Sequence, residues 1–299
     1  MKNYIKEHID AFREENKNRA RLLINCPDQP GIVAAISQFL AEHNANILES
    51  NQYSTNPKGG EFFIRLEFEM PQLKEKIATL EEDFKEIKEK FNMKATFKYV
   101  DQIKKVAVFV SKEPHCLLEL LWEWQSGDLM ADISLVVSNH ETSREYVESL
   151  GIPYYYIPAN KDIRNEVEEQ QIKLLKEHDI DVIVLARYMQ ILTPNFVEVF
   201  KNKIINIHHS FLPAFIGAKP YERAYNRGVK LIGATSHYVT NDLDEGPIIE
   251  QDISRVDHRD NAEVMKKIGQ SVERSVLARA VKWHLEDRII VYGNKTIVF

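Results

Sequence analysis

Residues 204–215 read IINIHHSFLPAF, an apolar run that passes directly into a group of polar side chains. The β-branched residues of Ile204–Ile207 predict a short buried strand. Asn206 and His208 are two residues apart, which places both side chains on one face of a strand. An amide beside an imidazole can polarise a carbonyl group and handle a proton. The stretch therefore predicts a site at the carboxyl end of this strand.

Four further apolar runs predict strands of the same kind, and they alternate with helical stretches such as 114–126 and 161–178. The runs are Lys105–Val110, Ile133–Val137, Tyr154–Ile157 and Val182–Leu185. Strands that alternate with helices predict a mostly parallel, Rossmann-like sheet, whose ligands bind at the carboxyl ends of the strands. The loop after the first of these strands, Ser111–His115, contains neither a GxGxxG fingerprint nor a phosphate-binding loop. A dinucleotide is therefore disfavoured, and we expect no cofactor.

The first hundred residues show a different pattern. An apolar run at 20–25 is followed by a turn at 27–31 and by an apolar helical face made of Ile32, Val33, Ile36, Phe39 and Leu40. Strand patterns at 47–55 and 61–69, a helical stripe at 73–91 and a strand at 94–100 complete the order βαββαβ. This order predicts a ferredoxin-like unit. We therefore expect an α/β chain with a small domain at 1–100, a short linker at 101–104 and a larger domain at 105–299.

Composition and charge exclude several classes of protein. The 299 residues carry 39 Lys and Arg against 45 Asp and Glu, a net charge of −6, which disfavours a nucleic-acid partner. Only Cys26 and Cys116 are present, which is too few for a disulfide framework or a thiolate zinc site. The amino-terminus lacks the apolar core of a signal peptide, and no window is long and apolar enough to span a membrane. The sequence predicts a cytoplasmic protein.

Asp28, Gln29, Pro30 and Gly31 resemble the D-x-P-G turn of the ACT family of small regulatory domains. This resemblance implies a site for an amino-acid effector at the turn, with methionine and glycine as candidates, and a homo-oligomer, a dimer or a tetramer. The start of a helix near Gly31 offers free N–H groups to a carboxylate. In the alternative interpretation, Pro30 and Gly31 only begin a helix, and the domain serves assembly.

Two strings resemble the formyltransferase family. INIHHSFLPAFIG corresponds to the family form N-I-H-x-S-L-L-P, and HYVTNDLDEGPII corresponds to H-x-V-x-x-x-x-D-x-G-P-I. The resemblance implies that Asn206, His208 and Asp244 are catalytic. Asn206 would donate to an oxyanion, His208 would donate to it or move a proton, and Asp244 would pair with His208 and position or deprotonate water. Which of these two residues takes the proton of the water stays open.

Members of this family that also carry an ACT-like domain hydrolyse 10-formyltetrahydrofolate to tetrahydrofolate and formate, which supplies formate and balances the one-carbon folate pool used in purine biosynthesis. The segments Ser111–Leu121 and Leu185–Phe196 match their pattern. The alternative within the fold is transfer of the formyl group to an amine. The loop Ser111–His115 lacks the glycines with which such transferases hold an acceptor phosphate, which favours water as the acceptor.

The resemblance also implies a pocket for the folate. Its predicted lining consists of Met189, Gln190, Ile191, Leu192, Val239 and Thr240. His237 is expected to support the site, and His115 to help shape a water site. Ile191 and Leu192 could instead belong to the core.

Two other functions compete with this interpretation. The first is a metallohydrolase, with His208, His209, His237 and Asp244 as its ligands; because neighbours alternate along a strand, His209 should face away from His208, and we expect no metal. The second is an amino-acid sensor with a vestigial catalytic domain. The presence of Asn206, His208 and Asp244 together argues against it.

Overall fold

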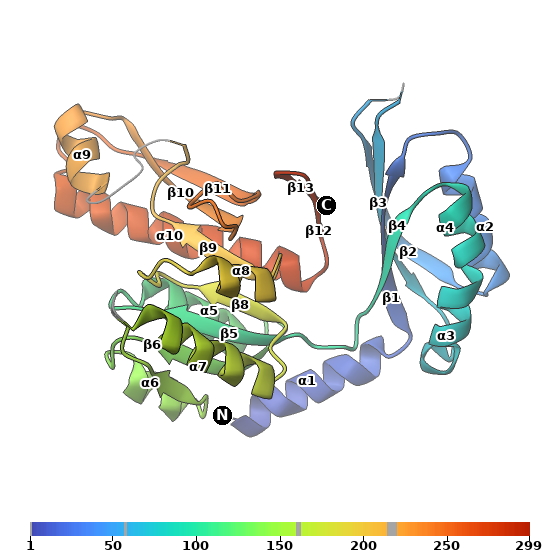
Figure 1. The fold of residues 1–299 in the computed structure, drawn as a ribbon, viewed down its shortest axis with the longest axis horizontal. Coiled ribbons are helices and arrows are strands. Elements are labelled where there is room, and N and C mark those ends of the chain that lie inside the picture. The colour runs from blue at the N-terminus through green and yellow to red at the C-terminus, as the bar shows by residue number, and fades with distance from the viewer. Residues whose placement is uncertain (1, 57–58, 160–162, 214–219) are drawn as a thin grey trace. The chain divides into compact units, whose positions relative to one another are not determined.

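The computed structural model describes residues 2–299 except 57–58, 160–162 and 214–219. By their internal contacts these residues form two units: a larger one built mainly from Lys104–Leu285, and a smaller one built mainly from Lys6–Ile103, which Glu286–Tyr292 joins (Figure 1). Parts of two expectations lie outside the described residues, namely positions 161–162 of the predicted helical stretch and positions 214–217 of the string INIHHSFLPAFIG.

The smaller unit is an antiparallel sheet with the strand order β2-β3-β1-β4. Figure 1 shows its helices α2, α3 and α4 on one side of that sheet. Alternate residues of β1, beginning with Ala20 and ending with Cys26, are buried. The expected ferredoxin-like unit is confirmed. Its elements are α1 (Lys2–Asn16), β1 (Arg19–Pro27), α2 (Ile32–Glu42), β2 (Asn46–Ser54), β3 (Glu61–Glu69), α3 (Leu73–Asp83), α4 (Lys85–Lys90) and β4 (Lys94–Tyr99).

The larger unit contains a seven-stranded sheet with the order β11-β10-β9-β8-β5-β6-β7. From β9 to β7 the strands are parallel, and β10 and β11 add two antiparallel strands at one edge. The expected mostly parallel sheet is confirmed. Its strands are β5 (Lys105–Val110), β6 (Asp132–Ser138), β7 (Tyr154–Tyr156), β8 (Val182–Leu185), β9 (Ile204–His208), β10 (Leu231–Tyr238) and β11 (Ile248–Arg255).

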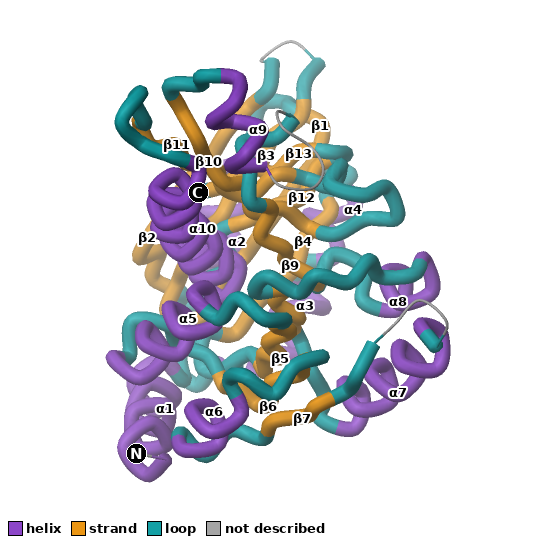
Figure 2. The backbone as a smooth tube through the Cα atoms, turned by 90° about the vertical axis from the view of Figure 1, so that its left-hand side faces the viewer, coloured by secondary structure: helices purple, strands orange, loops and turns teal. Residues whose placement is uncertain are grey.

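Helices cover both faces of this sheet. Figure 2 shows α7 and α8 on one side of it and α5, α6 and α10 on the other. The helices are α5 (His115–Ser126), α6 (Arg144–Ser149), α7 (Arg164–Glu177), α8 (Pro194–Val199), α9 (Pro220–Arg227) and α10 (Ala262–Leu285). Both faces are therefore buried, which explains why the parallel strands are continuous apolar runs. None of the helices in the described part of the chain is long and apolar enough to cross a bilayer.

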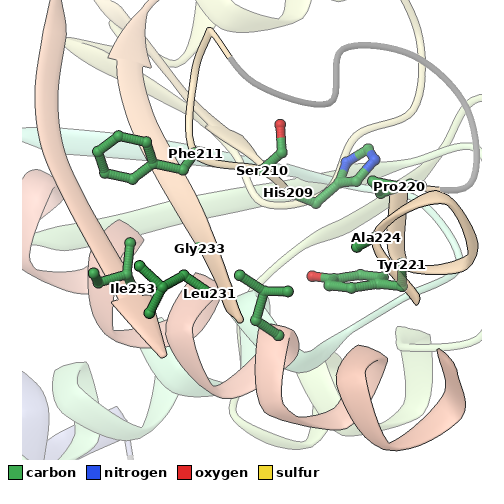
Figure 3. Close-up of a pocket in the computed structure, with 10 residues that line it drawn as sticks. His209, Ser210, Phe211, Pro220, Tyr221, Ala224, Leu231, Gly233 and Ile253 are labelled. Atoms are coloured by element: carbon green, nitrogen blue, oxygen red, sulfur yellow. The ribbon is translucent and has the colours of Figure 1, made fainter. Parts of the chain in front are cut away.

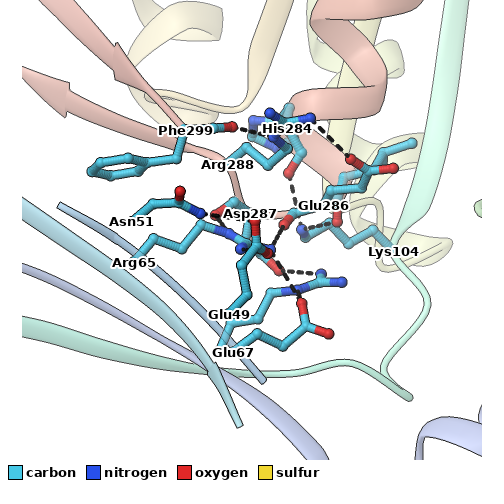
Figure 4. Close-up of polar contacts among 12 residues, drawn as sticks. Glu49, Asn51, Arg65, Glu67, Lys104, His284, Glu286, Asp287, Arg288 and Phe299 are labelled. Atoms are coloured by element: carbon cyan, nitrogen blue, oxygen red, sulfur yellow. Dashed lines mark hydrogen bonds and ion pairs between the residues drawn. The ribbon is translucent and has the colours of Figure 1, made fainter. Parts of the chain in front are cut away.

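The chain after α10 returns to the smaller unit. Arg65, on β3, is 3% exposed, and its guanidinium donates to the backbone carbonyls of Glu286 and Asp287 at 3.2 and 3.1 Å (Figure 4). Arg21 adds an ion pair of 3.2 Å to the carboxylate of Asp287. The start of Glu286–Tyr292 is therefore held on β1 and β3 by buried, charge-assisted hydrogen bonds. The sequence did not predict this return, nor the final strands β12 (Ile289–Tyr292) and β13 (Lys295–Val298).

Candidate active site

The candidate site begins on β9. Asn206 and His208 occupy one face of this strand, and the register pairs Asn206 with His237 on β10. Directly paired residues of neighbouring strands point to the same face, and the Asn206 Nδ2 atom lies 3.1 Å from His237 Nε2. The strand pairing therefore brings an amide and two imidazoles together.

Asp244 reaches this face through the loop that follows β10. This loop lies close to the strand, because a Cβ atom at Gly246 would lie 1.8 Å from the carbonyl oxygen of Tyr238. Asp244 itself adopts a left-handed backbone conformation, with φ of 59°. Its Oδ1 atom lies 3.2 Å from His208 Nδ1 and 3.7 Å from His237 Nε2. The D-x-G-P string is thus a turn that folds the carboxylate back over the strand that it follows.

The charge of Asp244 follows from its hydrogen bonds. The hydrogen bonds with His208 and then with His237 hold the pKa of Asp244 well below its usual range and outweigh the opposing effect of burial. Asp244 is therefore ionised at neutral pH. Because Asp244 engages Nδ1 of His208, Nε2 is the ring atom left for substrate, and it has no hydrogen-bond partner among the described residues.

His237 orients the amide of Asn206. Its Nδ1 atom lies 2.9 Å from the carbonyl oxygen of Tyr238, which can only accept a hydrogen bond. Nδ1 therefore donates to this carbonyl, and the other ring nitrogen, Nε2, lies 3.1 Å from Asn206 Nδ2 and 3.7 Å from Asp244 Oδ1. The amide thus contacts the imidazole on one side, and its other N–H is left to donate elsewhere.

The expected position of His209 was wrong. Its ring does not face away from His208 but stacks beside it, with the ring centroids 5.1 Å apart and the planes inclined by 20°. β9 ends at His208, so the alternation of side chains does not extend to the next residue. Burial, followed by the positive charge of Arg187, lowers the pKa of His209 to about 4, and the ring is neutral at neutral pH.

Helix α7 holds both ends of the predicted pocket loop. Gln171 Nε2 donates to the hydroxyl of Tyr188 at 3.0 Å, and the carboxylate of Glu168 accepts from the backbone N–H (2.9 Å) and the hydroxyl of Thr193. Both α7 side chains are buried, and they are one helical turn apart. In addition, the backbone N–H of Met189 donates to Ser111 Oγ at 2.9 Å. No local sequence pattern predicts this support.

The predicted pocket residues differ in how far they are exposed to solvent. Met189 and Ile191 are 58% and 54% exposed, so the alternative that Ile191 is core is wrong. Leu192 and Val239 are partly buried against the apolar cluster between the sheet and helices α7 and α8. The hydroxyl of Thr240 donates to the backbone carbonyl of Asp242 at 3.1 Å, and Gln190 is partly exposed.

His115 contacts a buried carboxylate that sequence reasoning missed. It is the first residue of α5, and its Nε2 atom lies 2.7 Å from Glu273 Oε2 on α10. Tyr221 donates to the other oxygen of Glu273 at 2.7 Å. Gly269, one turn before Glu273, makes room for Tyr221, because a Cβ atom there would lie 2.1 Å from the tyrosine hydroxyl. These contacts join residues that are far apart in the chain, so no local sequence pattern predicts them.

An apolar cavity of about 320 Å³ lies in the larger unit between α9, β10 and the segment after β9 (Figure 3). None of the predicted pocket residues contributes to it. Its lining includes Tyr221, which also contacts Glu273, and His209, which directly follows β9. Its described lining is His209, Ser210, Phe211, Pro220, Tyr221, Ala224, Leu231, Ile232, Gly233 and Ile253.

The predicted regulatory turn lies between β1 and α2. Gly31 precedes the helix with φ of 96°, and no side chain caps the first turn of α2. Gln29 and Pro30 are exposed. Asp28 is partly buried, and its carboxylate accepts a hydrogen bond from the hydroxyl of Ser54. The helix therefore leaves N–H groups available at an exposed turn.

Comparison with known proteins identifies the family. The formyl transferase family model matches residues 104–281, and the ACT domain model matches residues 20–84. The chain is 66% identical to a formyltetrahydrofolate deformylase of Bacillus subtilis (strain 168) over the full length of both. The crystal structure of a formyltetrahydrofolate deformylase from Pseudomonas syringae pv. tomato str. DC3000 matches with a TM-score of 0.90, 46% identity and full coverage of both chains.

A glycinamide ribonucleotide transformylase from Symbiobacterium toebii shares less of the chain. It matches with a TM-score of 0.62 and 26% identity, over 66% of this chain and 94% of that one. The named deformylases cover both domains of the chain, whereas this transformylase matches 66% of it. The chain therefore belongs to the formyltetrahydrofolate deformylase family.

Proposed function

We propose that this chain hydrolyses 10-formyltetrahydrofolate to tetrahydrofolate and formate, with Asn206, His208 and Asp244 as its catalytic residues. The observation that carries the proposal is the 3.2 Å contact between Asp244 Oδ1 and His208 Nδ1, on the strand face that also bears Asn206. Hydrolysis of a formyl amide needs a donor for the oxyanion and a group that moves a proton from water to the departing nitrogen. The three side chains supply these functions.

The lowered pKa of Asp244 assigns different roles to Asp244 and His208. A carboxylate with so low a pKa is a weak base, whereas it stabilises an adjacent imidazolium strongly. His208 therefore takes the proton of the attacking water through Nε2 and later returns it to N10 as the C–N bond breaks. Asp244 remains ionised throughout and holds Nδ1. The free N–H of Asn206 donates to the oxyanion.

The folate ring is assigned to the loop Met189–Leu192 together with Val239 and Thr240. The support for this is the exposure of Met189 and Ile191 and the fixed ends of their loop, which give a preformed apolar surface with backbone groups at its edge. This surface follows β8, the neighbour of the catalytic strand β9 in the sheet.

A formate assay without any amine tests the proposed reaction. Purified enzyme incubated with 10-formyltetrahydrofolate in amine-free buffer should release one formate for each tetrahydrofolate formed. Tetrahydrofolate that appears only when an amine is added, as a formylated product, would instead show a transferase.

The turn Asp28–Gly31 is proposed to bind an amino-acid effector through the uncapped N-terminus of α2. Calorimetry with methionine and with glycine tests this, and the absence of heat with both would leave the domain an assembly element. A homo-oligomer, a dimer or a tetramer, is part of the same proposal. Light scattering on the purified chain measures it directly.

A further inference from the structure

A second group of buried polar side chains meets around Glu273, outside the Asn206, His208 and Asp244 group. The carboxylate of Glu273 is 1% exposed and accepts from His115 and Tyr221, each at 2.7 Å. Arg187 Nε lies 3.4 Å from the same oxygen that His115 contacts. Burial by itself would raise the pKa of Glu273. The hydrogen bond from His115 and the charge of Arg187 outweigh this effect and bring the pKa below its ordinary value, so Glu273 is ionised. Both carboxylate oxygens are thus already engaged.

Arg187 is held in an unusual backbone conformation. Its φ is 66°, in the left-handed region that glycine and asparagine favour and that an arginine rarely adopts. The residue lies just beyond the end of β8, and its side chain is 12% exposed. A strained backbone that carries a buried guanidinium indicates a task for that side chain.

Several buried nitrogen atoms of this region lack a hydrogen-bond partner. Arg187 Nη1, a donor, has none among the described residues, and neither do the ring nitrogens Nδ1 of His115 and Nε2 of His208. An unsatisfied buried donor destabilises the folded state. Arg187 and His115 follow β8 and β5, and His208 ends β9; these strands are neighbours in the sheet, so all three residues lie at the carboxyl ends of adjacent parallel strands. An occupant with acceptor oxygens would satisfy the guanidinium, and also either imidazole when it is protonated.

A metal ion does not fit this group as well. Ligand atoms of His115, Cys116 and Glu273 lie within 4.8 Å of one another. However, burial raises the pKa of the Cys116 thiol well above its ordinary value, which disfavours the thiolate that a metal would need. The carboxylate oxygens of Glu273 already accept from His115 and Tyr221. The unsatisfied Nη1 group of Arg187 can only donate, so it favours an anion over a cation.

We propose that Arg187 and His115 form a subsite for the formate released by the reaction, beside His208. The inference rests on the proposed function, because hydrolysis makes formate at this edge of the sheet. A guanidinium presents paired N–H groups that match a planar carboxylate. Arg187 and Glu273 balance each other in charge. Hydrolysis of the neutral amide yields formate and one proton, and an imidazole of His115 or His208 that carries this proton offsets the charge of the bound anion.

Titration of the resting enzyme with ¹³C-formate, followed by NMR line broadening, tests the subsite without turnover. We expect saturable binding by the natural enzyme, weakened about tenfold or more in Arg187→Gly, since a charge-assisted bidentate contact is lost. Glycine suits a φ of 66°, so this variant should fold; its circular dichroism and melting curve verify that. His115→Phe gives a second test and should also weaken binding. Arg274→Ala removes the same charge from α10 and should bind formate as the natural enzyme does.

The outcomes separate the two proposals. Release of formate from 10-formyltetrahydrofolate together with linear, unsaturable broadening would overturn the subsite and leave the hydrolase intact. Equal affinity in Arg187→Gly and the natural enzyme would overturn it as well. Saturable binding that both variants weaken supports the subsite, and the amine-free assay decides the reaction independently.

Discussion

Asp244 Oδ1 lies 3.2 Å from His208 Nδ1, although 36 positions separate these residues and β10, which leads to Asp244, runs antiparallel to the strand that carries His208. The contact depends on a loop that turns back at Gly246 and on the left-handed backbone of Asp244. This contact is therefore a property of the loop as much as of the two side chains.

Asp244→Asn should lower kcat by about 10²–10⁴, because the imidazolium that forms on His208 loses its anionic partner. The amine-free formate assay measures this loss. Asp242→Asn changes an exposed carboxylate two positions away and should retain the natural rate. Unchanged hydrolysis by Asp244→Asn would refute the role given to Asp244.

Gly246→Ala should impair catalysis without touching a catalytic side chain. The added Cβ would meet a backbone oxygen at 1.8 Å, so the loop must move and carry Asp244 away from His208. We expect a loss of kcat comparable to that of Asp244→Asn, together with a lower melting temperature. Glu245→Ala, at the exposed neighbouring position, is the matched control. A fully active Gly246→Ala enzyme would show that the loop tolerates displacement.

Sequence patterns predicted those parts of the fold that depend on local order. Apolar runs such as Lys105–Val110 and Val182–Leu185 coincide with β5 and β8, because strands buried on both faces must be apolar throughout. The helical stripe at 73–91 divides into α3 and α4 at Phe84, a break that its continuous periodicity concealed.

The site was only partly accessible from sequence. The spacing of Asn206 and His208 is local and predicted a shared face, and family resemblance supplied Asp244. Glu273 and Arg187 carried no signal, since the contacts of Glu273 with Arg187 and with His115 join three segments that are distant in the chain. Long-range polar pairing depends on tertiary structure, which no periodicity encodes.

Glu168→Gln tests whether α7 positions the proposed folate loop. The amide offers one acceptor where the carboxylate offers two to Thr193, and a lost charge-assisted hydrogen bond of about 1.5 kcal/mol corresponds to roughly a tenfold rise in KM. Because the catalytic strand is untouched, kcat should change less. Glu169→Gln, on the exposed face of the same helix, is the control. A fall in kcat with KM unchanged would contradict a role in positioning the loop.

Arg65→Met tests the anchoring of the chain after α10. The substitution removes the donors to Glu286 and Asp287 and leaves the carboxylate of Glu67, 16% exposed, without one of its partners. Breaking a buried charged contact costs about 3–5 kcal/mol, so thermal unfolding should begin at a lower temperature. Lys88→Met alters an exposed side chain of the same unit and should leave the transition unchanged. An unaltered melting curve in Arg65→Met would show that other contacts hold the segment.

The lowered pKa of His209 predicts an acid-sensitive contribution to stability. The folded state keeps this ring neutral down to about pH 4, whereas in the unfolded chain it binds a proton near pH 6.5. Between these values the unfolded state holds more protons, so the free energy of unfolding falls as the pH drops from about 6.5 to 4. In His209→Gln this contribution is absent, and its stability should decline less over that interval than that of the natural enzyme. Urea unfolding at pH 7, 5.5 and 4.5 measures both curves, and parallel curves would show that His209 titrates alike in the folded and unfolded states.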